Sequence, residues 1–329
     1  ESWAIQMPYD QGTKTVVEVV DNGLSRANQL FQDSGSIWEN AAEKNGVTGL
    51  DDDGNGLVDD INGWNYVGSN SNVNDDSNHG THVAGTILGV GQDVFAVPVR
   101  ESKVKIMALK FLDSNGGGST SNDISAIYYA VDKGANVINN SWGGPTYSQS
   151  LHEAYTYAYE HGVVVVSAAG NSNSNNDVTP MYPSSFDTPN NISVLATTDS
   201  DNKASFSNYG AQAVTLAAPG VAILSSVPGT GCAAPGCFQM MSGTSMAAPF
   251  VAGLAALVIR EASQLSAYQI KSIIVASVDT IANFSSFTTS GGRVNAYKSI
   301  ESAKAQAGAP AWSPQYAPDY KSNRSVASD

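Results

Sequence analysis

The stretch Gly243-Thr244-Ser245-Met246-Ala247-Ala248-Pro249 decides how the chain is interpreted. The residues that follow, 250–259, carry no charge and are almost all apolar, which is typical of a helix buried on nearly every side. The first turn of this helix would hold Ser245, next to unpaired backbone N–H groups and the positive end of the helix dipole. A serine there can attack a carbonyl and have the oxyanion stabilised, or it can simply cap the helix.

Composition limits the classes of protein to which the chain can belong. Its 329 residues are 42% hydrophobic and 14% charged, which is enough for one large core or a core with a tail. The net charge of −14 argues against partners such as nucleic acid or an anionic membrane. No apolar run is long enough to predict a transmembrane helix. Because residues 1–3 do not resemble a signal peptide, we expect either a cytosolic protein or numbering from a mature terminus.

The two cysteines favour the second of these alternatives. Cys232 and Cys237 flank Ala-Ala-Pro-Gly, and the Pro-Gly pair favours a turn that can bring the sulfurs together. A disulfide closing so short a loop would stabilise the fold by about 2 kcal/mol through chain entropy. Free thiols are the alternative, and a metal site is disfavoured because no histidine lies nearby. We therefore expect a disulfide and an extracellular protein.

Strand and helix patterns alternate along the chain. Residues 14–21 form an almost continuous β-branched run, interrupted by Glu18, which predicts a strand buried on both faces of a parallel sheet. Further strands are expected at 103–112, 135–141, 162–169 and 191–197, and helices at 121–133, at 149–160 and after the capping box Ser266-Ala267-Tyr268-Gln269. This alternation predicts an α/β fold with a parallel sheet.

The acidity is partly clustered in residues 51–60, Asp-Asp-Asp-Gly-Asn-Gly-Leu-Val-Asp-Asp. Oxygen-bearing residues at the first, third and fifth positions, with Gly at the sixth, match the start of a calcium loop. The twelfth position is Asn62 rather than Glu, so the pattern is like an EF-hand loop without being one. A solvated acidic loop is the alternative. The predicted ligands of a structural calcium are Asp51, Asp53, Asn55, the carbonyl of Leu57, and Asp59 or Asp60.

A second helix is expected to begin in residues 78–89, with Asn78 as its cap. His79 and His82 lie three residues apart and share a face. Zinc is disfavoured because a third ligand and the glutamate of His-Glu-x-x-His are both missing. We expect one histidine to be catalytic and the other to be structural.

Four residues then combine into the parts of an acyl-transfer site. Asp21 ends a strand, a histidine and Ser245 begin helices, and Asn171 ends the run Val-Ser-Ala-Ala-Gly-Asn. A serine needs a base to remove its proton, and the histidine needs a carboxylate to hold its tautomer. The Asn171 amide can donate to the oxyanion.

The sequence resembles the subtilisin-like serine proteases (subtilases) from residue 14 to about residue 300. The motifs are Val-Val-Asp-Asn-Gly at 19–23, Asn-His-Gly-Thr-His-Val-Ala-Gly at 78–85, Ala-Ala-Gly-Asn at 168–171 and Gly-Thr-Ser-Met-Ala-Ala-Pro at 243–249. Their order of Asp, His and Ser is that of the family. The resemblance implies that Asp21 orients the base, His79 is the base, Ser245 is the nucleophile, and Asn171 with the Ser245 N–H forms the oxyanion hole.

The resemblance also implies a three-layer subtilisin-like α/β fold, with a mostly parallel twisted central sheet flanked by helices. One peptidase domain is expected over residues 1–309, with a calcium-loop insertion at about 48–66 and a C-terminal tail at 310–329. The segments Gly116-Gly117-Gly118 and Ser141-Trp142-Gly143 look like the family's two edge segments, which would sandwich an extended substrate.

Met181 stands where many relatives have Gly, in the stretch that builds the pocket for the residue before the scissile bond. We expect its side chain to shorten this pocket and to favour small or medium apolar residues. Three further positions depart from the family pattern. Asn22 replaces Ser or Thr, Phe250 replaces a frequent His, and Gln29 replaces a calcium-binding Asp, which puts that conserved calcium site in doubt.

The function implied by the resemblance is a secreted serine endopeptidase that hydrolyses peptide bonds through an acyl-enzyme. Such a protein is expected to act as a monomer on protein or peptide substrates, after removal of a propeptide that serves as inhibitor and folding aid. The alternatives are a narrow-specificity processing protease and a non-catalytic calcium-binding or adhesion module on the same scaffold. The intact set of Asp21, His79, Ser245 and Asn171 favours an enzyme.

Overall fold

The computed structural model describes residues 14–91, 102–229 and 237–307. Within them, a nine-stranded sheet has the order β10-β11-β7-β6-β5-β4-β1-β3-β2. Every neighbouring pair is parallel except β10 with β11. The strands are β1 (Thr15–Asp21), β2 (Gly63–Asn65), β3 (Val104–Lys110), β4 (Val137–Asn140), β5 (Val164–Ala168), β6 (Asn191–Thr197), β7 (Leu216–Pro219), β10 (Asp279–Thr280) and β11 (Gly292–Arg293).

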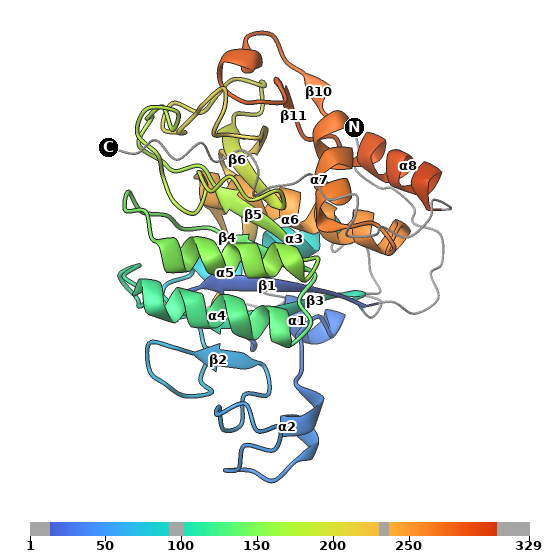
Figure 1. The fold of residues 1–329 in the computed structure, drawn as a ribbon. Helices are drawn as coiled ribbons and strands as arrows, with labels where there is room; N and C mark the ends of the chain where they lie inside the picture. The colour runs from blue at the N-terminus through green and yellow to red at the C-terminus, as the bar shows by residue number, and fades with distance from the viewer. Residues whose placement is uncertain (1–13, 92–101, 230–236, 308–329) are drawn as a thin grey trace.

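Helices cover both faces of the sheet (Figure 1). The buried side chains of α4 and α5 form an apolar cluster on one face, and those of α3, α6, α7 and α8 form a second cluster on the other. This arrangement confirms the predicted three-layer α/β fold. The helices are α1 (Gln29–Ser34), α2 (Ala41–Asn45), α3 (His79–Gly91), α4 (Thr120–Asp132), α5 (Gln149–Glu160), α6 (Thr244–Glu261), α7 (Ala267–Ala276), α8 (Ala296–Gln306) and the 3-10 turn η1 (Phe284–Ser286).

Strand β1 shows how the two clusters are divided. Val17 and Val19 belong to the cluster of α3 and α6, whereas Val20 belongs to that of α4 and α5. Because successive side chains of a strand point to opposite faces, Glu18 lies on the side of Val20, under α4 and α5. None of these four side chains is more than 3% exposed. The strand is buried on both faces, as predicted, and it ends with Asp21 at the carboxyl edge of the sheet.

Helix α6 is the core helix that the opening stretch predicts. Every residue from Thr244 to Val258 is buried except Phe250. Among the described residues it is also the one helix long and apolar enough to cross a membrane, but 72% of that span is buried inside the protein. It therefore packs as the central helix of a folded core.

A two-stranded antiparallel hairpin, β8 (Ile223–Val227) with β9 (Cys237–Met241), leads into α6. Cys237 is buried at the start of β9, and its expected disulfide partner, Cys232, lies outside the described residues. The predicted tail at 310–329 lies outside them as well.

Candidate active site

Asp21 and His79 meet at the carboxyl edge of the sheet, where β1 ends and α3 begins. His79 Nδ1 lies 2.9 Å from both carboxylate oxygens of Asp21, which is fully buried. Burial lowers the pKa of His79, but the charge and hydrogen bond of Asp21, together with the charge of Asp75, outweigh this and raise the pKa above its usual value. The imidazole is therefore oriented by a carboxylate and can accept a proton.

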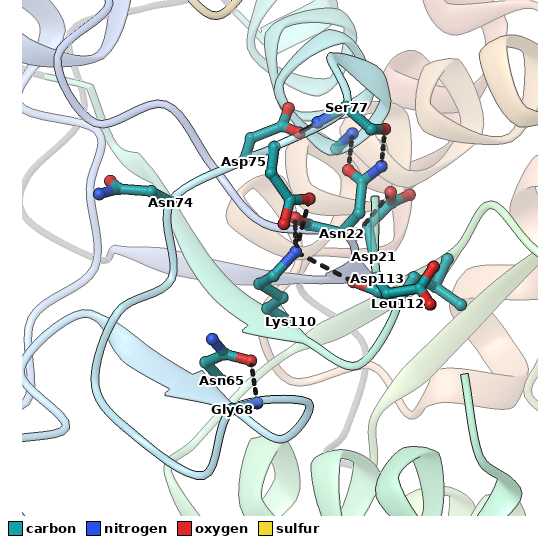
Figure 2. Close-up of polar contacts among 12 residues, drawn as sticks. Asp21, Asn22, Asn65, Gly68, Asn74, Asp75, Ser77, Lys110, Leu112 and Asp113 are labelled. Carbon is teal, nitrogen blue, oxygen red and sulfur yellow. Dashed lines mark hydrogen bonds and ion pairs between the residues drawn. The ribbon is translucent and has the colours of Figure 1, made fainter. Parts of the chain in front are cut away.

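The side chain of Asn22 holds the residues on either side of His79. Asn22 Oδ1 accepts from the Gly80 N–H over 2.8 Å, and Asn22 Nδ2 donates to Ser77 Oγ, so one amide clamps the chain on both sides of His79 (Figure 2). This gives a positional role to a residue that departs from the family pattern.

Asn78 directly precedes α3, and its carbonyl accepts the first helical hydrogen bond, from His82, but the prediction that its side chain caps the helix is wrong. The Thr81 N–H donates to Asp75 Oδ2 over 2.9 Å, and the Ser77 and Asn78 N–H groups donate to Asp75 Oδ1. Asn78 adopts φ of 90°, a left-handed conformation, whereas a capping residue is usually extended. Asp75, four residues before His79, therefore does what was expected of Asn78.

His82 lies inside the fold rather than in the site. Its Nε2 lies 3.0 Å from the Ile223 carbonyl and 3.1 Å from the Gln239 carbonyl, so it joins α3 to the β8–β9 hairpin. Burial lowers the pKa of His82, which keeps the ring neutral. Of the two histidines, His79 is thus the one placed beside the buried carboxylate.

Ser245 lies in the first turn of α6, as predicted, and is 8% exposed. Its hydroxyl donates to the Ser141 carbonyl over 2.9 Å. No hydrogen bond joins Ser245 to His79 in the described part of the chain. Contacts of this kind are often formed only when substrate binds, and a rotation about the Cα–Cβ bond of Ser245 would redirect its hydroxyl.

Two nitrogen atoms of the predicted oxyanion hole lie near Gly243. The Asn171 Oδ1 accepts from the Thr244 N–H over 2.9 Å and from the Thr244 hydroxyl over 3.0 Å, which leaves Asn171 Nδ2 to donate elsewhere. A Cβ added to Gly243 would lie 3.6 Å from both Asn171 Nδ2 and the Ser245 backbone N. Both nitrogen atoms therefore lie close to Gly243, next to Ser245.

The two predicted edge segments follow β3 and β4. Phe111 leads into Gly116-Gly117-Gly118, and its ring lies edge-on to Trp142, with centroids 4.9 Å apart. Beyond Trp142, Gly144 and Tyr182 exchange two backbone hydrogen bonds of 2.8 Å. The ring contact places the residue after β3 beside the middle of the second segment.

The Met181 side chain extends between the ends of β4 and β5. A Cβ added to Gly143 would lie 3.2 Å from Met181 Cγ, and one added to Gly170 would lie 3.2 Å from Met181 Cε. The Met181 side chain thus spans the distance between Gly143 and Gly170, which directly precedes Asn171.

Three carboxylates come together beside the acidic loop, and two of them, Asp53 and Asp60, are predicted ligands. Oxygens of Glu43, Asp53 and Asp60 lie within 4.8 Å of one another. Glu43, in α2, was missed because it lies outside the acidic run and has no pattern of its own. Asp51 also accepts from the N–H groups of residues 54, 55 and 56, and Asp59 accepts from the N–H of residue 49, and these hydrogen bonds hold the loop backbone.

The three grouped carboxylates are also joined to protein donors. The Asn40 amide donates to Asp53 over 2.7 Å and to Asp60 over 2.8 Å. Lys133 Nζ contacts Asp53, and the pKa of Asp53 is lowered because these hydrogen bonds and the Lys133 charge outweigh the effect of burial. Three carboxylates against one ammonium leave the group with net negative charge, and its all-oxygen donor set suits calcium.

The known proteins to which this chain is similar are serine proteinases with an α/β fold. Among curated relatives, thermitase from Thermoactinomyces vulgaris is 37% identical over 241 residues, covering 73% of this chain and 81% of the relative. Subtilisin DY from Bacillus licheniformis is 36% identical over 236 residues, covering 71% and 82%.

Two solved structures with a similar fold are also proteases. A lanthipeptide protease superposes with a TM-score of 0.67 at 27% identity, covering 88% of this chain and 87% of that one. A cold adapted subtilisin-like serine proteinase superposes with a TM-score of 0.64 at 29% identity, covering 88% and 92%. The model of the subtilase family matches residues 12–306, and the chain belongs to that family of serine peptidases.

Proposed function

We propose that the protein is an endopeptidase that cleaves peptide bonds through an acyl-enzyme on Ser245. The observation that carries the proposal is the contact of His79 Nδ1 with the buried Asp21 at 2.9 Å. This contact fixes the imidazole with Nε2 as its free nitrogen, the atom that a general base uses. The first turn of α6 supplies the nucleophile at the same edge of the sheet.

The proposed hydrolysis uses Ser245, His79 and Asn171 in turn. Ser245 turns from the Ser141 carbonyl toward His79, which takes the hydroxyl proton as oxygen attacks the scissile carbonyl. The oxyanion accepts from Asn171 Nδ2 and the Ser245 N–H. His79 gives its proton to the leaving amine, and water repeats the sequence to release the acid.

Substrate binding is proposed to use the two edge segments, with an extended peptide pairing between 116–118 and 141–143. The Met181 thioether, between Gly143 and Gly170, supports a shortened pocket for the residue before the scissile bond. Small or medium apolar residues would fit it best, which favours a narrower specificity than that of an open pocket.

A structural calcium is proposed at the carboxylates of Glu43, Asp53 and Asp60. Their mutual distances of at most 4.8 Å and their uncompensated charge support this site. The ion would neutralise the group and fix the loop to α2 and α4. The protein is further proposed to be secreted as a monomer, with a Cys232–Cys237 disulfide, after removal of a propeptide.

Peptide hydrolysis by matched variants tests the proposed chemistry. Ser245→Ala and His79→Ala should abolish cleavage, and Asn171→Ala should lower kcat by about 10²–10³-fold with little change in KM, the cost of one oxyanion donor as measured in subtilisin. Full activity of Ser245→Ala would refute the proposal.

A further inference from the structure

Lys110 places a buried ammonium beside the candidate active site. It ends β3 directly opposite Asp21 of β1, and its side chain is 5% exposed. A buried charge is costly unless it is paired and hydrogen-bonded. The role of Lys110 therefore depends on which groups accept from it.

Three acceptors use all three N–H bonds of this ammonium. Lys110 Nζ donates to the Asn22 carbonyl over 2.6 Å, to Asp76 Oδ1 over 2.8 Å and to the Leu112 carbonyl over 3.0 Å (Figure 2). A lysine has three donors and no acceptor, so its hydrogen-bonding capacity is filled.

Each acceptor belongs to a different functional segment. Asn22 directly follows Asp21, and Asp76 lies three residues before His79. Leu112 begins the segment that leads to Gly116-Gly117-Gly118, and the Phe111 and Leu112 N–H groups both donate to the Asp21 carbonyl, over 3.0 and 3.2 Å. The ammonium thus hydrogen-bonds to all three loops, which carry the proposed carboxylate, the proposed base and the first substrate edge.

We propose that Lys110 is a positioning residue, whose ammonium sets the Asp21–His79 geometry and fixes the first substrate edge to it. The inference rests on the proposed peptidase function. Removing the ammonium leaves the Asn22 and Leu112 carbonyls without this donor, so both loops can shift. Misplacement of catalytic groups by about 1 Å can cost about 10²-fold in rate.

The same strand provides a matched control. Lys105 is also a buried lysine of β3, and its ammonium donates to the Gly35 carbonyl. It pairs with Val16 near the opposite end of β1, away from Asp21. Lys105→Met therefore removes a buried ammonium from the same strand without touching the loops that Lys110 joins.

The test measures kcat and KM of full-length wild type, Lys110→Met and Lys105→Met, with active sites counted by a serine-reactive phosphonate. Two substrates are used, a short activated ester and a peptide long enough to reach the edge segments. We expect Lys110→Met to lower kcat per titrated site about 10²-fold on both substrates and to raise KM on the peptide. Lys105→Met should stay within threefold of wild type on both, even if its melting temperature falls.

A purely structural role would lower the titratable fraction and the melting temperature of Lys110→Met but leave kcat per titrated site within threefold of wild type, and that result overturns the inference. Equal losses in both variants overturn it too. If Lys110→Met does not fold, Lys110→Gln, whose shorter side chain cannot reach all three acceptors, is judged by the same criteria with an expected loss of about 10-fold. A wild type that cleaves no peptide refutes the proposed function instead.

Discussion

Ser245 and Ser141 hold each other through two hydrogen bonds, because the hydroxyl of each donates to the backbone carbonyl of the other over 2.9 Å. Ser245, the proposed nucleophile, is thereby tied to the segment that is proposed to bind substrate. A peptide pairing with residues 141–143 would compete for this segment, and release of the Ser245 hydroxyl would follow substrate binding. In the described residues the Ser245 hydroxyl is thus hydrogen-bonded to Ser141 and not to His79, its proposed base.

The pH dependence of peptide hydrolysis should reflect the raised pKa of His79. A general base must be unprotonated, so kcat/KM should rise with pH through an apparent pKa above the usual 6.5. The Asp75 charge contributes to this shift, and Asp75→Asn should therefore move the rise to lower pH. Rate profiles of both proteins on one peptide provide the check. An unmoved profile in Asp75→Asn would show that Asp75 does not contribute to the shift, and a wild-type rise centred below 6.5 would contradict the assignment of His79 as the base.

Glu18 and Asp123 should make the fold less stable at alkaline pH. Both are fully buried, and within the described residues their carboxylate oxygens have no hydrogen-bond partner. Burial raises the pKa of each well above its ordinary value of 4.5 or 3.8, with mutual repulsion adding for Glu18. The native state then binds more protons than the unfolded state, so stability falls as pH rises above the ordinary carboxyl range toward the raised pKa values.

Glu18→Gln and Asp123→Asn should flatten this fall, because a neutral amide of the same shape needs no proton. Melting temperatures measured from pH 5 to pH 10 should converge at the acid end and favour the variants at the alkaline end. Parallel curves for wild type and variants would mean that these carboxyls do not stay protonated in the fold.

The pocket proposed at Met181 predicts a specificity change. Met181→Gly should raise the ratio of kcat/KM for peptides with Phe or Tyr before the scissile bond to kcat/KM for the matched Ala peptide. The expected change corresponds to about 1–3 kcal/mol, the usual scale of steric selection in an apolar pocket. Met181→Leu, which keeps the bulk, should retain the wild-type profile. A wild type that already strongly prefers Phe would show that the thioether does not limit the pocket.

Chelation should lower the melting temperature if calcium occupies the group formed by Glu43, Asp53 and Asp60. An ion that binds only the native state stabilises it by about 2.7 kcal/mol at a hundredfold excess over its dissociation constant. Glu43→Gln should blunt the response to chelator. Asp52→Asn lies in the same acidic run but outside the group, and it should respond like wild type. An identical response of Glu43→Gln and wild type would exclude Glu43 as a ligand.

The parts of the fold that sequence predicts are those with a dense local signal. Strands β1, β3, β4, β5 and β6 are buried on both faces, and all of them except β4, Val-Ile-Asn-Asn, are mostly apolar in sequence. Strands β2, β10 and β11 have only two or three residues, too few to show any periodicity. Their pairing is decided by the neighbouring strands rather than by their own composition.

The residues of the candidate site also fall into those that the sequence predicts and those that it does not. Asp21, His79, Asn171 and Ser245 each lie at an element boundary within a recognisable motif, so their positions could be predicted. Lys110 and Glu43 could not, because their roles come from contacts distant in sequence. Lys110 reaches Asn22 across 88 positions, and Glu43 reaches the Asp59 N–H across 16. Neither hydrophobic periodicity nor motif spacing in the sequence predicts such a contact.

Labelling with a serine-reactive phosphonate, followed by peptide mapping, tests the central claim most directly. In wild type the adduct should form on Ser245, because only an activated serine reacts with such a reagent at a useful rate. Folded His79→Ala should lose the labelling, since the hydroxyl then has no base. An adduct on another residue, or undiminished labelling of Ser245 in His79→Ala, would contradict the assignment of Ser245 and His79 as nucleophile and base.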